Sequence, residues 1–374
     1  MHQKDVLLTN NKMEKEKYNK LIMKQISGAE AMIHCLLAEG VDLIYGYPGG
    51  AIMPVYDELY KFQKKLNHIL TRHEQGAVHA AQGFARTSGK VGVAIATSGP
   101  GATNLITGIA DALIDSTPIV CITGQVASHL LGTDAFQETD IIGISTPATK
   151  WSYQITKANE IPYVMAKAFY IARSGRPGPV LIDITKDAQF ELFDFEYKKC
   201  LGIRSYNPMP EINTKKIDEA ISIINNAKKP LLVWGQGVIL GRAEEELKSF
   251  IEKTGIPAVW TILGLSALPT SHPLNMGMVG MHGNYGPNLL TNECDVLIAV
   301  GMRFDDRVTG DLNTYAKQAK IIHLEIDPSE INKNVKVDVP ILGNCKESLG
   351  ILIKKIKENN FSSWINHFKR LYEI

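Results

Sequence analysis

The sequence lacks the features that would indicate a metal cluster, a disulfide framework or a membrane span. Its five cysteines are scattered and no pair has CxxC spacing, so we expect reduced thiols in a cytoplasmic protein. No apolar run approaches the roughly 18 residues that a spanning helix needs. The net charge of +1 gives no electrostatic reason to expect nucleic acid or an anionic membrane as a partner.

The first two dozen residues lack arginine and are rich in lysine and asparagine. They contain neither the apolar centre of a secretory signal nor the arginine-rich amphipathic pattern of a transit peptide. This composition predicts a disordered tail.

From Ile26 onward the sequence alternates between expected strands and expected helices. SGAEAMIHCLLAEG has apolar residues at helical spacing, and the strand-like runs VGVAIAT and PIVCITGQ are separated by the helical LITGIADALID. Such alternation indicates parallel sheets covered by helices on both faces. A charged and aromatic stretch interrupts it before a second series starts with KKIDEAISIINNA and PLLVWGQGV. The sequence thus predicts an α/β fold with two doubly wound parallel-sheet domains.

The expected organisation has five parts, which agrees with a length of 374 residues at about 150 residues per domain. They are a tail (1–23), a first α/β domain (24–187), a linker (188–209), a second α/β domain (210–350) and an amphipathic segment that starts a further linker (351–374).

Three loops of the first domain should lie at the carboxyl ends of strands, where parallel sheets bind ligands. They are YPGG (Tyr47 to Gly50), RHEQG around Glu74, and SGPGATN (Ser98 to Asn104). SGPGATN lacks the lysine of a Walker loop and equally fits tight packing. Glu74 equally fits the preference of helix first turns for acids. His73 and His79 have no partner at metal-ligand spacing, so we expect packing or surface roles.

Two further patterns suggest binding surfaces. In the second domain, GQG (Gly235 to Gly237) follows a strand and LEID (Leu324 to Asp327) ends another, which suits a nucleotide-sized ligand. The full GxGxxG fingerprint is absent, because GQGVIL has no third glycine. In the first domain, Phe136 stands in a polar loop, DAFQE. The residues alone predict a two-domain α/β protein that binds nucleotide-like cofactors.

Eight motifs occur together in the order and spacing of one known family: YPGGAIMPVYDEL, RHEQGAVHAAQGFART, ATSGPGATNLITGIADA, ITGQV, GTDAFQE, SGRPGPVLIDITKD, GMHG and GMRFDDRVTG. By these motifs the chain closely resembles the large catalytic subunits of acetolactate synthase (acetohydroxyacid synthase), from about Lys24 to Gly350. DAFQE with RFDDRVTG argues against sibling thiamine enzymes such as glyoxylate carboligase, sulfoacetaldehyde acetyltransferase or pyruvate oxidase. A non-catalytic FAD-binding or subunit-interaction protein is the alternative from another class.

The resemblance implies a transferase that condenses two pyruvates to 2-acetolactate and CO2, or pyruvate with 2-oxobutyrate. This reaction belongs to isoleucine and valine (branched-chain amino acid) biosynthesis. The implied cofactors are thiamine diphosphate, FAD and Mg²⁺, and the implied partners are further large subunits in a homodimer or tetramer and a regulatory small subunit. In this family the glutamate at Glu74 hydrogen-bonds N1′ of the aminopyrimidine and favours its imino tautomer, so that C2 of the thiazolium can lose its proton.

Other family roles are carried over by position. Tyr47 and Gly50 would line the thiamine diphosphate site, while Phe136, Gln137 and Lys186 would border the substrate channel at the interface with a second subunit. The residues that match family contacts to FAD are Arg176, Gly235, Gly237, Thr261, His282, Gly283, Arg303, Asp305, Glu325 and Ile326.

The chain departs from the family pattern in three respects. Gln82 stands where an acid is usual and Thr185 where a proline is usual, and we expect both to be tolerated. The third domain of the family, whose GDG…N motif holds Mg²⁺ and the diphosphate, is not found. The resemblance therefore implies a C-terminally truncated subunit that is inactive by itself.

Overall fold

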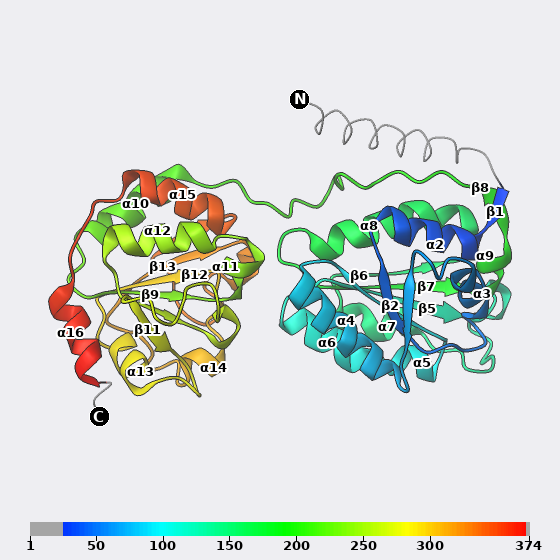
Figure 1. Ribbon diagram of the computed structural model, residues 1–374, viewed down its shortest axis with the longest axis horizontal. Coiled ribbons are helices and arrows are strands. Elements are labelled where there is room, and N and C mark those ends of the chain that lie inside the picture. The colour runs from blue at the N-terminus through cyan, green and yellow to red at the C-terminus, as the bar shows by residue number, and fades with distance from the viewer. Residues whose placement is uncertain (1–24, 372–374) are drawn as a thin grey trace. The chain divides into compact units, whose positions relative to one another are not determined.

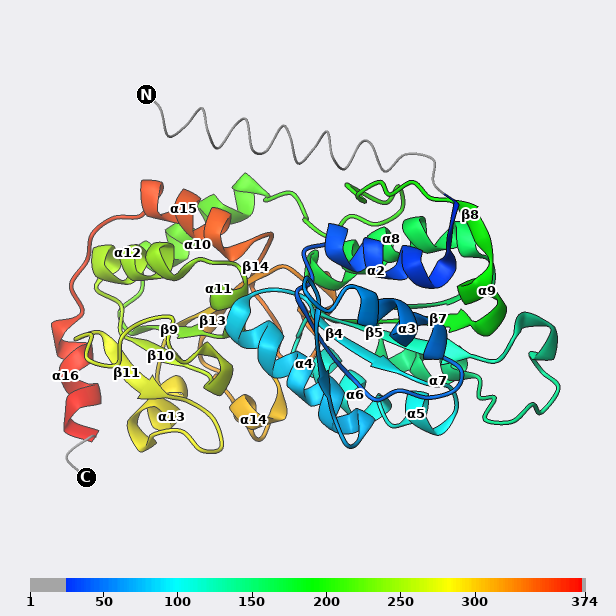
Figure 2. The ribbon, with the colours of Figure 1, turned by 45° about the vertical axis from the view of Figure 1, so that its right-hand side comes forward.

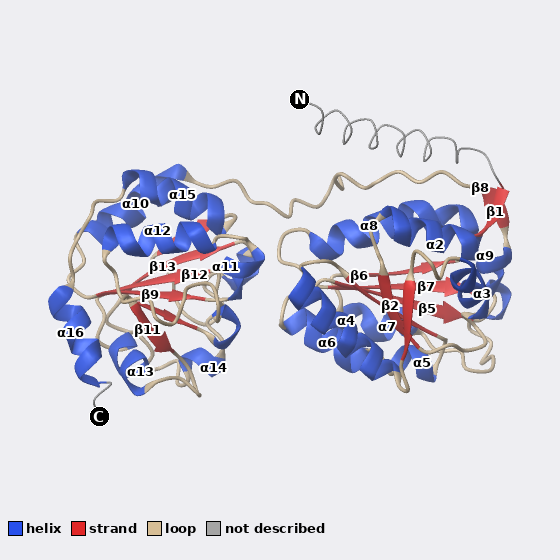
Figure 3. Cartoon of the chain, viewed as in Figure 1, coloured by secondary structure: helices blue, strands red, loops and turns tan. Residues whose placement is uncertain are grey.

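Two units make up the chain, Met1–Tyr206 and Asn207–Ile374, and each contains one six-stranded parallel sheet (Figure 1 and Figure 3). The computed structural model describes residues 25–371, so the tail expected at 1–23 lies outside the described part. The predicted fold class, two doubly wound parallel-sheet domains, is confirmed. Within residues 25–371, no helix is both long enough and apolar enough to cross a membrane.

The sheet of the first unit has the strand order β3-β2-β4-β5-β7-β6. Its strands are β2 (Leu43–Gly46), β3 (Asn67–Leu70), β4 (Gly92–Ala96), β5 (Ile119–Gln125), β6 (Trp151–Ile155) and β7 (Pro179–Thr185). Strand β3 lies on one side of β2 and β4 on the other, so the direction in which successive strands are added to the sheet reverses at β2. Ligands bind in parallel sheets at such a switch point, outside the carboxyl ends of the strands.

The helices of the first unit cover both faces of this sheet. They are α2 (Gly28–Ala38), α3 (Met53–Lys61), α4 (Glu74–Ser88), α5 (Pro100–Thr103), α6 (Ile106–Ile114), α7 (Ile141–Ser145), α8 (Ile161–Arg173) and α9 (Lys186–Phe190), with short 3-10 turns η1 (Ser128–Leu130), η2 (Thr146–Ala148) and η3 (Ala158–Glu160). In Figures 1 and 2, α2 and α8 lie on one side of the sheet and α4 and α6 on the other.

Strand β4 shows how the alternation of side chains separates two apolar clusters. Val93 and Ile95 join the cluster formed with α2, α3 and α8, while Ala94 and Ala96 join the cluster formed with α4 and α6. The side towards α4 therefore carries small residues. A Cβ on Gly92 would lie 2.2 Å from the carbonyl oxygen of Ala81 in α4, so the helix packs directly onto the sheet.

The segment expected as a linker, 188–209, begins within the first unit. Strand β8 (Leu192–Asp194) pairs antiparallel with β1 (Gln25–Ser27). After it, Phe195 is buried in the core and the Tyr197 hydroxyl donates to the Glu39 carboxylate. The aromatic residues that gave this stretch its irregular composition thus anchor it to the first unit, and the boundary between the units falls after Tyr206.

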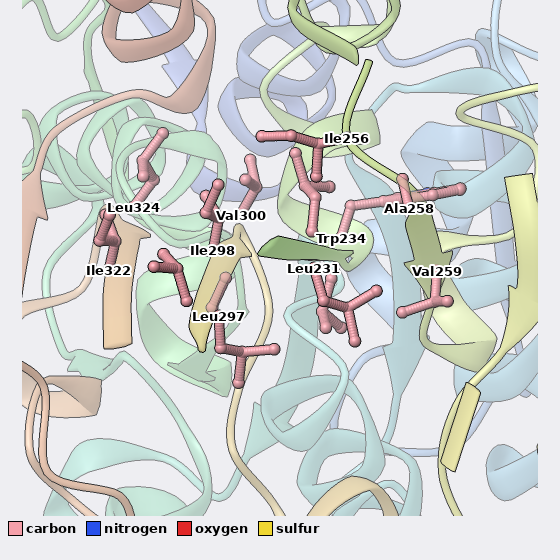
Figure 4. Packing of buried hydrophobic residues seen from close by; sticks show 14 of the residues in the cluster. Leu231, Trp234, Ile256, Ala258, Val259, Leu297, Ile298, Val300, Ile322 and Leu324 are labelled. Atoms are coloured by element: carbon pink, nitrogen blue, oxygen red, sulfur yellow. The ribbon is translucent and has the colours of Figure 1, made fainter. Parts of the chain in front are cut away.

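The sheet of the second unit has the order β11-β10-β9-β12-β13-β14. Its strands are β9 (Pro230–Trp234), β10 (Ala258–Trp260), β11 (Asn275–Met278), β12 (Val296–Val300), β13 (Lys320–Glu325) and β14 (Val339–Leu342). Counted along the chain this is 3-2-1-4-5-6, the order of dinucleotide-binding sheets, with the switch point between β9 and β12. Figure 4 shows the apolar core around these strands, in which Trp234 is fully buried and donates from Nε1 to Gly264 O (2.8 Å).

The helices of the second unit are α10 (Thr214–Asn225), α11 (Gln236–Leu240), α12 (Glu244–Thr254), α13 (Tyr285–Thr291), α14 (Asp306–Thr309), α15 (Cys345–Lys355) and α16 (Ser362–Leu371), with 3-10 turns η4 (Ile262–Gly264) and η5 (Pro328–Glu330). Helix α16 belongs to the segment expected to start a further linker, 351–374. It packs on this unit instead: Phe368 is fully buried, and Trp364 Nε1 donates to Pro230 O (2.9 Å). The apolar face that made this segment amphipathic is covered by the second core.

Candidate functional site

Glu74 is the first residue of α4, and three residues separate it from the end of β3. His73 caps this helix, since its Nδ1 accepts a hydrogen bond from the N–H of Gln75 (3.0 Å). The side chain of Glu74 is directed inward, and the residue is only 7% exposed. Interaction with the helix dipole requires no burial, and burying a carboxylate costs free energy unless it gains partners. The inward position therefore indicates a further role.

The SGPGATN loop supplies the partner. Asn104 Nδ2 donates to Glu74 Oε2 (3.0 Å), whereas within residues 25–371 no hydrogen bond reaches Oε1. A Cβ on Gly101 would lie 3.2 Å from Oε1, so the glycine keeps the space beside this oxygen open. The two oxygens of this carboxylate therefore have different surroundings.

The YPGG loop lies against the same glycine turn, across the switch point between β2 and β4. The N–H of Ala51 donates to Thr97 Oγ1 (3.2 Å), and a Cβ on Gly49 would lie 2.5 Å from Thr97 Cβ. Tyr47 is 43% exposed, and a Cβ on Gly50 would meet no atom within 4 Å. The structure therefore brings together the three loops that the sequence placed at strand ends.

Tyr56 of α3 is affected by the charge of this carboxylate, although the sequence gave no signal for it. Burial, and next the negative charge of Glu74, raise the pKa of Tyr56 well above its usual range. Its hydroxyl lies 3.3 Å from His68 Nε2 in β3 and stays protonated. Asn104 stands in the SGPGATN loop that the sequence placed at a strand end, but the sequence gave no signal for its contact with Glu74.

The DAFQE loop lies at the same edge of the sheet. Phe136 is 87% exposed, and Gln137 has a positive φ of 58°. A Cβ on Gly99 would lie 2.6 Å from Gln137 O, so the backbone of Gln137 rests directly on the glycine turn. Lys186 is exposed at the start of α9, which follows β7 without a break.

The positions that depart from the family pattern, and the two histidines, have structural roles. Gln82 is buried, and its Nε2 donates to Gly108 O in α6 (2.8 Å). Thr185 is fully buried at the end of β7. His73 caps helix α4, as described above. His79 lies at the surface of the same helix, with its Nδ1 3.8 Å from Asp111 Oδ2. Within the described part of the chain, no three His, Cys, Asp or Glu side chains form a group able to hold a metal ion.

In the second unit, glycines let two strand-end loops pack against each other at the switch point. The N–H of Gly237 donates to Gly301 O (2.8 Å), and a Cβ on Gly237 would lie 2.7 Å from Gly301 Cα. A Cβ on Gly235 would lie 2.6 Å from the same carbonyl oxygen. These glycines are thus required by backbone packing.

The other positions expected for a nucleotide lie after neighbouring strands of this sheet. Glu325 ends β13, and its Oε1 accepts from the N–H groups of Ile326 (2.8 Å) and Asp327 (3.0 Å). Arg303 Nη2 lies 3.6 Å from Asp305 Oδ2, and Asp305 caps α14. The remaining positions are Thr261 after β10 and the loop residues His282 and Gly283 after β11.

His323 of β13 is a buried histidine that the sequence did not single out. Its Nε2 lies 2.9 Å from Met302 O and 3.7 Å from Glu325 Oε2. Burial lowers the pKa of His323 to about 4, against the raising effect of the Met302 carbonyl. The ring is therefore neutral at pH 7, and its hydrogen bond links the end of β13 to the residues that follow β12.

Arg176 lies in the first unit, in the loop between α8 and β7. Its Nε donates to Ser116 Oγ (2.8 Å). The same loop is fixed by Lys150, whose Nζ donates to Ile171 O and to Ser174 O (2.8 Å).

Comparison with protein families identifies both units. Residues 26–144 match the model described as thiamine pyrophosphate enzyme, N-terminal TPP binding domain, and residues 217–352 match the central domain of the same enzymes. The chain belongs to the thiamine pyrophosphate enzymes. Glu74 and the three loops around it lie within the range matched by the TPP-binding domain.

Curated relatives of this thiamine pyrophosphate enzyme include the acetolactate synthase large subunit of Corynebacterium glutamicum, 50% identical over 353 residues. Others are the acetolactate synthase of Mycobacterium bovis (49% over 343 residues) and a probable acetolactate synthase large subunit of Methanococcus aeolicus (48% over 361 residues). These matches cover 92–93% of this chain but only 55–60% of each relative. The chain thus spans little more than half the length of these relatives, and its resemblance to acetolactate synthase large subunits is confirmed.

Proposed function

We propose that the chain serves as an acetolactate synthase large subunit in the cytoplasm. The reaction condenses two pyruvates to 2-acetolactate and CO2, or pyruvate with 2-oxobutyrate, in isoleucine and valine biosynthesis. The observation that carries this proposal is Glu74: a buried carboxylate oriented by Asn104 at the switch point of a TPP-binding domain. The 48–50% identity to acetolactate synthases supports the choice among thiamine pyrophosphate enzymes.

The residues around Glu74 fit the aminopyrimidine of thiamine diphosphate. Oε1 has space beside it at Gly101, and the loop that carries Tyr47 and Gly50 leaves backbone and an exposed ring at the same edge. Glu74 would hold a proton shared with a ring nitrogen, and Asn104 would keep the carboxylate in place for it. Thiamine diphosphate, when bound, supplies the carbon nucleophile and the electron sink for a 2-oxo acid.

For the second unit we propose FAD as the ligand. The 3-2-1-4-5-6 strand order supports a dinucleotide, and the proposed contacts follow strands β9 to β13 at one edge of the sheet. Because Gly235 and Gly237 have no side chains, the loops can pack close together at the switch point. This close packing would let a long ligand extend across the ends of the strands. The proposed contacts are Gly235, Gly237, Thr261, His282, Gly283, Arg303, Asp305, Glu325 and Ile326, with Arg176 from the first unit.

The substrate channel and the partners complete the proposal. Exposure of Phe136 and Lys186 is consistent with side chains that border a channel shared with a second large subunit in a homodimer or tetramer. A regulatory small subunit would join this assembly. We further propose that Mg²⁺ and the diphosphate are held by the part of the relatives' length that the chain does not span, so that the chain by itself forms no acetolactate.

The test is an acetolactate assay with pyruvate, thiamine diphosphate, FAD and Mg²⁺. It compares the chain alone with a fusion of residues 1–350 to the C-terminal part of the Corynebacterium glutamicum relative. We expect activity only in the fusion, and carboligation of pyruvate to exceed that of glyoxylate or sulfoacetaldehyde. A folded fusion that acts on neither pyruvate nor 2-oxobutyrate would contradict the proposed activity.

A further inference from the structure

A loop of the first unit, residues 126–140, connects β5 to α7 and carries Phe136 and Gln137. Apolar burial does not hold it, since Phe136 is 87% and Leu130 38% exposed. Its ordered conformation must therefore come from polar contacts. Two carboxylates, from β7 and α9, provide these contacts.

Asp183 is fully buried in β7 and holds both ends of the loop through Gln125. The Thr123 hydroxyl donates to Asp183 Oδ1 (2.6 Å), and Nε2 of Gln125 (3.1 Å) and of Gln154 (2.8 Å) donate to Oδ2. Oriented in this way, Gln125 accepts from the N–H of Val126 (2.9 Å) and donates to Thr139 O (2.9 Å). The first residue of the loop and a residue near its end are thus tied to one amide.

Asp187 lies one turn further along, in α9, and contacts the loop directly. The N–H of Ser128 donates to Asp187 Oδ1 (2.9 Å), and the Ser128 hydroxyl donates to Oδ2. Partial burial raises the pKa of Asp187, but hydrogen bonds outweigh it and lower the pKa to about 2; the two from Ser128 contribute most, followed by those from Thr185 and the backbone of Asp187. Asp187 therefore stays ionised at neutral pH.

The far end of the loop is folded on itself and rests on the cofactor side of the sheet. The Glu138 carboxylate accepts from the N–H groups of Gly132 and Ala135, which closes the tip that carries Phe136. The backbone of Gln137 lies on Gly99, in the glycine turn that also contains Gly101 beside Glu74. Movement of the loop would therefore break its contact with the glycine turn beside Glu74.

A buried carboxylate in the centre of a sheet needs an explanation beyond packing. An apolar side chain at position 183 could fill the same space without burying a charge. Burial raises the pKa of Asp183 to about 6, despite the hydrogen bonds from its three donors. On the same face of β7, Leu181 and Thr185 are also fully buried. Burial thus disfavours the ionised form of Asp183, and its three hydrogen bonds offset this effect only in part.

We propose that Asp183 and Asp187 are positioning residues that hold loop 126–140 against the Gly99 turn and thereby fix Phe136 and Gln137 at the entrance to the Glu74 site. The meaning of this entrance for 2-oxo acids rests on the proposed function. The holding of the loop does not, because it concerns contacts within the first unit alone.

The test measures hydrogen exchange of residues 126–140 in the full chain, without cofactor or substrate. D187A should raise the exchange rate of this segment by roughly 10- to 100-fold, because two hydrogen bonds to a charged group are lost. D187N should stay near wild type, since an asparagine can accept from the N–H of Ser128 with Oδ1 and donate to its hydroxyl with Nδ2. Glu30→Ala, which removes a first-turn acid of α2 in the same unit, is the control and should leave this segment unchanged.

A spectroscopic reporter gives an independent readout. F136W places an indole at an exposed position. The emission of the parent chain, which has phenylalanine at 136, is subtracted to isolate the signal of this indole. Its anisotropy should fall when D187A or D183A is added. Exchange in β4 and β5 reports whether the sheet stays intact. If D183A does not fold, D187A and S128A carry the test, with S128A expected to act more weakly because the Ser128 N–H contact remains.

Two results would overturn the proposal. One is unchanged exchange and anisotropy of the loop in a folded D187A chain. The other is equal loosening by D187N and D187A, which would show that the charge at the start of α9 matters and the contact to Ser128 does not. Neither result touches the acetolactate assay, so failure here and failure of the proposed function are distinguishable.

Discussion

The two units share an architecture but prepare their switch points in different ways. In the first unit, polar side chains meet there: Glu74, Asn104 and Thr97 contact one another or the same glycines. In the second unit, backbone meets backbone, since Gly235 and Gly237 pack on Gly301. A charged proton acceptor suits chemistry on a ring, whereas low, glycine-lined loops suit the passage of a long ligand. The comparison teaches that the two sheets differ in the groups at their switch points as well as in strand order.

The largest effect should come from removing the proton acceptor of the first unit. In the fusion described above, we expect Glu74→Gln to lower acetolactate formation by about 100-fold or more, because an amide cannot share a proton with a ring nitrogen. Flavin binding by the second unit should not change, and Glu30→Gln is the matched control. Near-normal turnover in the Glu74 variant would contradict the role of this carboxylate as the proton acceptor at the first switch point.

Acidification should act on the two units in opposite directions. Burial raises the pKa of Asp183 from 3.8 to about 6, so the first unit gains stability as the pH falls through 6 towards 4. Burial lowers the pKa of His323 from 6.5 to about 4, so the second unit loses stability as the pH falls through 6.5 towards 4. Each contribution reaches at most about 3 kcal/mol.

This pH dependence can be measured by hydrogen exchange of β7 and β13 in a urea series at pH 8, 6 and 4.5. D183N and H323Q serve as references that cannot titrate at these positions. As the pH falls, the wild-type chain should gain stability relative to D183N and lose stability relative to H323Q. Parallel pH profiles for both units would refute the predicted difference.

Flavin affinity tests whether the first unit contributes to the ligand of the second. Arg176→Ala should weaken binding by about 1.5–3 kcal/mol, roughly 10- to 150-fold, through loss of a charge-assisted contact. Arg204→Ala removes the same charge from an exposed site of the same unit and should have no effect. A fluorescence titration with FAD measures both, and equal affinities for the two variants would exclude Arg176 from the flavin site.

The smallest effect tests the backbone packing of the second switch point. Gly237→Ala should destabilise this unit by about 1–3 kcal/mol, because its Cβ would overlap Gly301. Gly350→Ala, in the interior of α15 with no atom within 4 Å, should stabilise the same unit by up to about 1 kcal/mol. Tryptophan emission in urea measures both, since Trp234, Trp260 and Trp364 all lie in the second unit. Equal midpoints for the two variants would contradict the packing role.

The central strands could be predicted from sequence, whereas three of the four edge strands of the two six-stranded sheets could not. β4, β5, β9 and β12 are buried on both faces and read as apolar runs. Strands β6, β11 and β14 were not expected, and all three lie at sheet edges. An edge strand is covered less completely, so its sequence can contain polar residues or a proline, as Pro340 does in β14.

The candidate site divides in the same way. Glu74 and its two glycine loops could be placed at strand ends from the alternation of elements, because that position follows from parallel topology alone. The contact of Asn104 with Glu74, the proximity of Tyr56 and the network of Asp183 depend on side-chain directions across strands that are not adjacent in the sequence. Local pattern carries no information on such distant pairs.

The short antiparallel pairing of β1 with β8 has a consequence for the order in which the first unit could be connected. Gln25 pairs with Asp194 and Ser27 with Leu192, so the first described residues of this unit lie beside a strand near its C-terminal end. Neighbouring ends allow a chain to be closed into a ring and reopened elsewhere. A bridge from Tyr206 to Gln25, which keeps Phe195 and Tyr197 in place, would therefore permit circular permutation of this unit, with new ends in an exposed turn such as Gly89. The unit would then begin with β4 and finish with α4, leaving the sheet and the Glu74 carboxylate in place.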